Sequence, residues 1–123
     1  MTPRIRVLLG LAALIGFASV AAGAFGAHGA TGPAKDWLRT AGEYGLIHAL
    51  AVFAATPLVR EGARAAAVAA WLFLAGAVIF SGSLDVMAIS GQLWLGAVTP
   101  IGGLLLLAGW ATLAFAAFAK PAT

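Results

Sequence analysis

The sequence has no cysteine and few charged residues. Without cysteine the chain offers no disulfide, no thiolate nucleophile and no ligand for an iron–sulfur cluster. Charged residues make up only 9% of its 123 positions, whereas soluble domains carry roughly 25%. Hydrophobic residues make up 63%, and 16 glycines are available for close helix contacts. These proportions predict a single-domain integral membrane protein.

Basic residues give a formal net charge of +3, but they are scattered rather than gathered into a run or stripe. A nucleic-acid-binding chain would concentrate them on one surface, so we expect no nucleic-acid partner. The glycines belong to no Gly-Lys-Ser/Thr motif and no dinucleotide-binding fingerprint. No nucleophile, base and orienting group form a recognisable set, so we expect no enzyme and no cofactor.

Four apolar segments predict an all-α fold of four transmembrane helices in an antiparallel bundle, at approximately 7–27, 43–59, 65–89 and 94–119. The first, without a charge, spans roughly 31 Å and crosses a bilayer core. The second covers only about 24 Å as a helix, and Pro57 is expected to kink or stop it. Between them, 30–42 is expected to form a loop containing a short amphipathic turn or helix at the interface.

The side of each loop follows from its basic residues. Arg4, Arg6, Arg60, Arg64 and Lys120 fall on one side of a four-span protein, and only Lys35 and Arg39 on the other. The positive-inside rule then places both termini in the cytoplasm.

The interpretation that competes with a first membrane span is a cleaved signal peptide, because a basic head and an apolar run precede the small residues 22–24. The run is longer than the roughly 7 to 15 residues of a signal core.

Polar residues are expected to converge in the outer half of the membrane. Measured along each helix, His28, Glu43 and Asp85 reach an outer rim near 30 Å, above a deeper layer with Ser81, Thr99 and His48. Residues four apart share a helix face, which pairs Tyr44 with His48 and Ser81 with Asp85. The candidate polar cluster comprises His28, Glu43, Tyr44, His48, Ser81, Ser83, Asp85 and Thr99.

His48 is the clearest ionisable residue at membrane depth, where such residues often serve function. In the structural interpretation it donates to a backbone carbonyl, or bonds to Ser81 or Thr99. In the functional one it belongs to a proton or substrate path. A metal site from two histidines and two carboxylates has suitable ligand chemistry but no local ligand spacing, so we expect no metal. The rim residues are expected to pair among themselves in solvent.

Small residues predict where helices approach closely. Ala18, Ala22 and Gly26 recur every four positions in the first span, and Ala66 and Ala70 do so in the third, the pattern of tight membrane helix crossings. In the fourth span, Pro100 and 102–103 (GG) are expected to permit a bend or a close approach.

Five short motifs follow one another along nearly the whole chain: 23–29 (GAFGAHG), Glu43-Tyr44 with 48–50 (HAL), 80–84 (FSGSL), 99–103 (TPIGG) and Gly109-Trp110. Together they resemble the YgdD/YwdK-type family of small inner-membrane proteins. The resemblance implies four helices, a domain of unknown function and similarity to a small eukaryotic transmembrane family. It implies no activity. It also implies that 23–29 stays in the mature protein, which disfavours signal cleavage.

The sequence departs from that family at Asp85, where its members usually have tyrosine. If the rim residues serve function, Asp85 gives this protein a rim whose charge or ligand differs from that of its family.

These observations favour a multi-pass protein of the cell (inner) membrane with an accessory or scaffolding role. Its expected partners are the lipid bilayer and either further copies of itself or a larger membrane complex. The alternative is a small transporter or ion-handling protein that uses the polar cluster.

Overall fold

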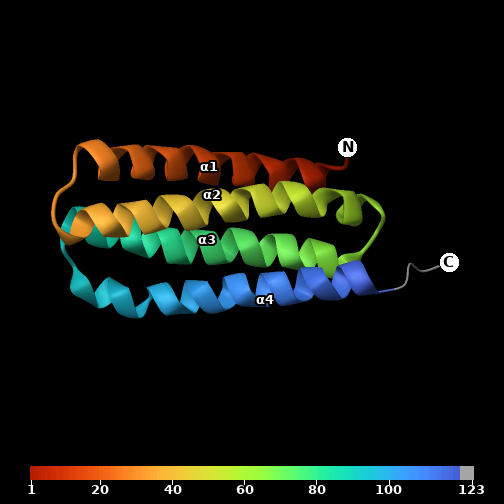
Figure 1. The fold of residues 1–123 in the computed structure, drawn as a ribbon. Coiled ribbons are helices and arrows are strands. Elements are labelled where there is room, and N and C mark those ends of the chain that lie inside the picture. Colours follow the sequence, from red (N-terminus) through yellow and green to blue (C-terminus); the bar gives the residue numbers. More distant parts are fainter. Residues whose placement is uncertain (120–123) are drawn as a thin grey trace.

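The computed structural model describes residues 1–119 as a helical protein with no strand in that range (Figure 1). Its helices are α1 (Pro3–His28), α2 (Pro33–Arg60), α3 (Arg64–Ser90), the 3-10 helix η1 (Leu93–Ala97) and α4 (Thr99–Phe118). Four segments are long and apolar enough to cross a membrane, the fourth being η1 with α4. The predicted all-α membrane fold is thereby confirmed. Lys120, one of the basic residues used to infer sidedness, lies outside the described residues.

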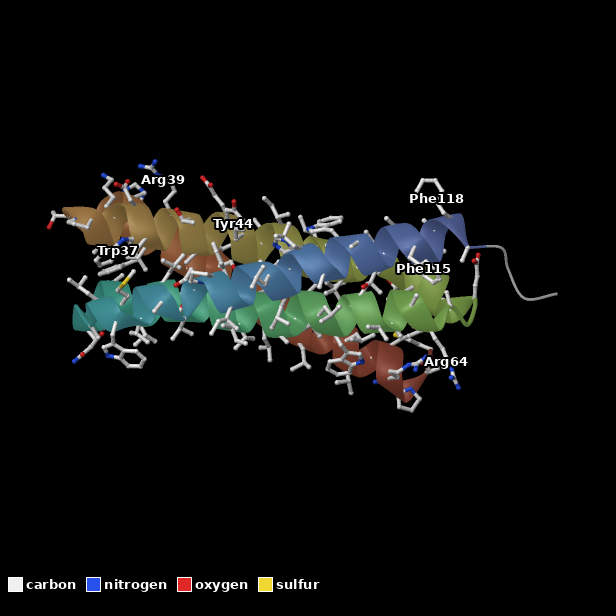
Figure 2. The ribbon with its side chains drawn as sticks, turned by 90° about the horizontal axis from the view of Figure 1, so that it is seen from below. Trp37, Arg39, Tyr44, Arg64, Phe115 and Phe118 are labelled. Carbon is white, nitrogen blue, oxygen red and sulfur yellow. The ribbon has the colours of Figure 1, made fainter. Side chains whose placement is uncertain are left out.

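The helices α2 and α3 form a central pair, and α1 and α4 lie on its two sides (Figure 1). α1 packs mainly on α2, and α4 packs mainly on α3. No Cα of α1 within the described chain lies within 8 Å of one in α4. The turned view shows α4 across α2 and α3, with α1 on the far side (Figure 2). The bundle is therefore layered around α2 and α3, and the outer helices leave much of their own surface uncovered.

The helix α2 begins ten residues before the expected start of the second span. Residues 33–42, predicted as a loop with a short interfacial turn or helix, continue into the span without a break. Pro33 suits the first turn, where a missing N–H costs no intrahelical bond, and Gly32 before it adopts a φ of 63° in the connection from α1. With 28 residues α2 is about 42 Å long. It is therefore not the short helix that the apolar run alone suggested.

Pro57 does not end α2, because the helix continues to Arg60. A proline has no N–H, so the carbonyl of Phe53, four residues earlier, loses its usual helical donor. The hydroxyl of Thr56 donates to that same carbonyl oxygen. A neighbouring side chain thus satisfies the backbone group that the proline leaves free, as membrane helices require.

The fourth span starts with η1, and Pro100 sits in the first turn of α4 rather than inside it. The hydroxyl of Thr99 donates to the carbonyl oxygen of Leu95 at 3.3 Å and links the two helices. The expected bend therefore lies at the junction of η1 and α4, N-terminal to the two glycines.

Glycines bring the backbones of α1 and α2 into contact. A β-carbon on Gly42 would lie 2.8 Å from the carbonyl oxygen of Ser19 and 3.2 Å from the nitrogen of Gly23. Real β-carbons almost never lie so close to backbone atoms, so only glycine fits without a shift of the helices. The dispersion attraction between such closely packed backbones favours association where water supplies no hydrophobic force.

The stripe that makes this contact differs from the predicted one. Gly26 is buried against Leu38, but Ala18 is exposed and lines a groove that faces α3. The face of α1 that contacts α2 contains Ser19 instead, and Ala18 points away from that face. In α3, Ala66 and Ala70 are both fully buried.

The close approach predicted for 102–103 (GG) takes place at Gly102 alone. Its Cα packs against the backbone of Phe80, where a β-carbon would collide, whereas a β-carbon on Gly103 would meet the Phe80 ring at an ordinary 3.8 Å. The same helix pair is also tight at Gly76, where a β-carbon would lie 2.7 Å from Leu106. Small residues on both helices therefore hold α3 and α4 together.

Candidate functional site

His48 lies near the middle of the membrane layer, about 16 Å along α2 from Val59. Its side chain is buried, at 5% exposure. Its Nδ1 is 2.7 Å from the carbonyl oxygen of Tyr44, one turn earlier, and its Nε2 is 2.9 Å from the indole nitrogen of Trp110 in α4. A carbonyl only accepts and an indole N–H only donates, so the ring is neutral, with its proton on Nδ1.

Aromatic rings enclose this imidazole. The ring centroids of Phe73 and Trp110 lie 5.6 and 5.8 Å from that of His48, and 4.8 Å from each other. Gly109 makes room for Phe73, because a β-carbon there would lie 2.7 Å from the phenyl ring. Trp110 as a whole remains 44% exposed on α4. His48 is therefore held in an apolar setting that uses both of its ring nitrogens.

Ser81 does not bond to His48. Its buried hydroxyl donates to the carbonyl oxygen of Ala41 at 2.8 Å and joins α3 to α2. Gly45 lies beside this bond, and a β-carbon on it would collide with the hydroxyl of Ser19 from α1 and lie 3.3 Å from that of Ser81. Hydroxyl groups from two helices thus meet over a glycine of the third, at a seam where α1, α2 and α3 come together.

Ser83 and Thr99 form a second polar contact, between α3 and α4. Their hydroxyl oxygens are 2.6 Å apart, and Ser83 also lies 2.9 Å from the carbonyl oxygen of Phe80. The two hydroxyls carry two protons for three contacts, so one hydroxyl donates to the other while the accepting one donates to its own backbone carbonyl. Thr99 is thus separate from His48, although the sequence placed the two residues in one layer.

The residues expected at the outer rim do not assemble into a cluster. His28 and Glu43 are exposed, and no hydrogen bond or ion pair joins them to Asp85 in the described part of the chain. The ion pair found in that part, Asp36 with Arg39, lies near the N-terminus of α2. The predicted rim pairing fails because Glu43 faces outward from α2, five positions from the inward-facing His48.

Asp85 differs from the other polar side chains of the interior in the hydrogen bonding of its buried atoms. In residues 1–119 its Oδ1 is the sole buried side-chain nitrogen or oxygen atom without a hydrogen-bond partner. The residue as a whole is partly exposed and lies on α3 about 30 Å from Ala65, toward the end of the bundle opposite the N-terminus. Its carboxyl group therefore has an oxygen that no other described residue satisfies.

Within residues 1–119, no three histidine, aspartate or glutamate side chains lie close enough together to hold a metal ion.

The eight residues predicted to form one polar cluster are therefore divided among His48 at mid-depth, two hydroxyl contacts and the separated rim residues. Tyr44 contributes its carbonyl to His48 and stacks its ring on the same imidazole at 6.1 Å. Sequence reasoning missed Trp110 as the partner of His48, although Gly109-Trp110 had stood out as a motif.

The fold and this interior define a four-helix integral membrane protein whose membrane-depth polar groups bond mainly to one another and to the backbone. Comparison with known families matches residues 22–103 to the family described as "Protein of unknown function (DUF423)". The chain belongs to this family.

Several named relatives support the assignment. The chain is 36% identical to UPF0382 membrane protein YwdK of Bacillus subtilis (strain 168), an alignment that covers 91% of this chain and 96% of the relative. It is 41% identical to UPF0382 inner membrane protein YgdD of Escherichia coli (strain K12), over 86% and 85% of the two chains. A UPF0382 membrane protein of Haemophilus influenzae is 39% identical over 89% and 92%. No solved structure matches the chain.

The protein is therefore a multi-pass protein of the cell (inner) membrane. The family resemblance noted in the sequence is confirmed. The family's biochemical activity is unknown.

Proposed function

We propose that this protein is a small accessory or scaffolding protein that acts by packing against a partner or a second copy of itself, and that it carries out no catalysis. The observation that carries this proposal is the bonding of His48, whose two ring nitrogens are both used inside the bundle. The hydroxyls of Ser81, Ser83 and Thr99 are engaged in the same way. Side chains that hold helices together in this manner supply register rather than chemistry.

The outer face of α4 is the surface that we assign to packing. Leu104, Leu107 and Phe115 are exposed there, with Ala108 and Ala111 between them. Since α1 lies on the opposite side of the central pair, it does not cover this face. Small residues between large ones allow another helix to approach, which is how membrane helices associate.

Cysteine cross-linking in native membranes tests the proposal, because the chain has no cysteine of its own. Ala108→Cys on α4 is compared with Ala24→Cys on α1, a matched exposed alanine. We expect a specific cross-linked species from α4 and none from α1. A protein that gives no cross-link at either position, and that purifies alone as a monomer in mild detergent, would contradict the proposal.

A second candidate is a small transporter or ion-handling protein, and Asp85 is the observation in its favour. An unpaired carboxylate oxygen in a membrane helix is the kind of group that binds an ion or carries a proton. Ion or proton flux into liposomes that is reduced in both Asp85→Asn and His48→Gln would support this candidate. Flux no greater than that of empty liposomes would remove it.

We propose further that both termini face the cytoplasm. Figure 1 shows the N-terminus, the connection from α2 to α3 and the end of α4 at one end of the bundle. Arg4 and Arg60 line one cavity there, and Arg64 begins α3 at the same end (Figure 2). Lys35 and Arg39 lie at the opposite end in the first turns of α2. This asymmetry of basic residues supports a cytoplasmic location for the end that carries the termini.

A further inference from the structure

An apolar groove runs along the membrane-facing surface between α1 and α3. Its volume is about 590 Å³, and its walls include Leu11, Ile15 and Ala18 of α1 with Trp71, Ala75 and Val78 of α3. No charged residue lines it. The two helices run parallel here. Both pack closely on α2 but touch each other little, so the space between them stays open.

The face of α3 that lines the groove continues past it to Asp85. Residues 71, 75, 78, 82, 85 and 89 follow one face of a helix, because they recur at intervals of three and four. Gly82 stands on this face just beyond the groove, and a β-carbon built on it would have no atom within 4 Å. The surface at Gly82 is therefore uncovered, and Asp85 follows one turn further along the same face.

Asp85 places a carboxylate on this face of α3, one turn beyond Gly82. It makes no hydrogen bond or ion pair with any residue in the range 1–119, and one of its oxygens is buried. A carboxylate at such a level is stabilised by a cation that can also donate hydrogen bonds. No basic side chain of the described protein fills this role.

We infer that the groove between α1 and α3 binds one phospholipid with a primary ammonium headgroup. An acyl chain occupies the apolar groove and passes Gly82, and the ammonium group lies against the carboxylate of Asp85. Phosphatidylethanolamine has this chemistry. Phosphatidylglycerol has the same phosphate and acyl chains but no cation, so Asp85 repels its headgroup without compensation.

The experiment measures lipid retained by the delipidated full chain after matched additions of phosphatidylethanolamine or phosphatidylglycerol with identical acyl chains, read by native mass spectrometry. We expect the wild-type protein to retain phosphatidylethanolamine roughly fivefold better, the upper range for one partly solvated ion pair. Asp85→Asn should bring the ratio close to one. Equal retention of the two lipids by the wild-type protein would overturn the inference.

Two further variants separate the groove from the rest of the lipid-facing surface. Ala75→Leu fills the groove from α3. Ala54→Leu makes the same change at an exposed alanine of α2, away from the groove and from the packing face of α4. Ala75→Leu should lower the retention of both lipids, and Ala54→Leu should leave it unchanged. If both variants retain phosphatidylethanolamine as the wild-type protein does, the groove is not the site and the inference fails.

Discussion

The indole N–H of Trp110 donates a hydrogen bond of 2.9 Å to Nε2 of His48, across 62 positions of the sequence. This bond connects α4 to α2, two helices that otherwise touch little. It also determines the tautomer of the histidine, because Nδ1 must then donate to the carbonyl of Tyr44. One hydrogen bond thereby joins α4 to α2 and sets the tautomer of His48.

Trp110→Phe should destabilise the protein by about 0.6 kcal/mol, and by no more than roughly 1.7 kcal/mol, the range for hydrogen bonds between membrane helices. The loss should be coupled to His48. In the His48→Leu background the same tryptophan change should cost much less, because the acceptor is already gone. A double-mutant cycle of unfolding in detergent measures the coupling. Trp94→Phe is the control, since its indole bonds only to Gln92 two residues away.

Gly102→Ala and Gly103→Ala should differ sharply although the positions are adjacent. A methyl group at 102 collides with the backbone of Phe80, and at 103 it meets only the edge of the ring. We expect Gly102→Ala to cost about 1 to 3 kcal/mol, as overpacking does, and Gly103→Ala to be tolerated. Thermal unfolding of the two variants tests this, and equal melting temperatures would show that α3 and α4 do not pack as closely as described.

Thr56→Val should leave the carbonyl of Phe53 without a donor, at a cost of about 1 kcal/mol. Pro57→Ala restores an N–H at the position where the helix normally bonds that carbonyl. The threonine change should therefore cost clearly less in the Pro57→Ala background. Unfolding free energies of the four proteins measure this, and an equal cost in both backgrounds would mean that Thr56 does not substitute for the missing helical bond.

Reporter fusions test the proposed sidedness. A fluorescent protein that folds only in the cytoplasm should be active when fused after residue 123, and a phosphatase that works only outside should be active when inserted at Thr31. Replacing Arg4, Arg6, Arg60 and Arg64 by glutamine, while adding lysines near 29–32, should shift the balance of the two signals. A C-terminal phosphatase that is active in the unmodified protein would contradict the assignment.

Composition was enough to predict the fold class, because four long apolar segments in a chain with so few charges have few alternatives to membrane helices. The start of α2 was harder to predict. Lys35, Asp36 and Arg39 suggested that the helix had not yet begun. These residues instead form the first turns of α2, because charged side chains outside the apolar segment do not interrupt the helical backbone bonds. Hydropathy reports the membrane layer rather than the ends of the helix.

The partner of His48 was not predictable from the pattern, because α4 is apolar all around and gives no sign of which side faces inward. A backbone carbonyl as the acceptor for His48 was predicted, because an imidazole without a hydrogen-bond partner is costly in lipid. The rim grouping of His28, Glu43 and Asp85 relied on depth alone. Depth places residues at one level, whereas the rotation of each helix decides whether they meet, and Glu43 faces away.

The most direct test of the accessory role is the state of the His48 ring, measured by nitrogen-15 NMR on the protein in lipid bilayers. We predict one neutral tautomer with the proton on Nδ1, a resolved contact to the Trp110 indole N–H, and slow exchange of the ring proton with deuterated water. A charged ring, a mixture of tautomers or rapid exchange would mean that water reaches His48. The histidine would then be part of a working path, and the accessory function would give way to transport.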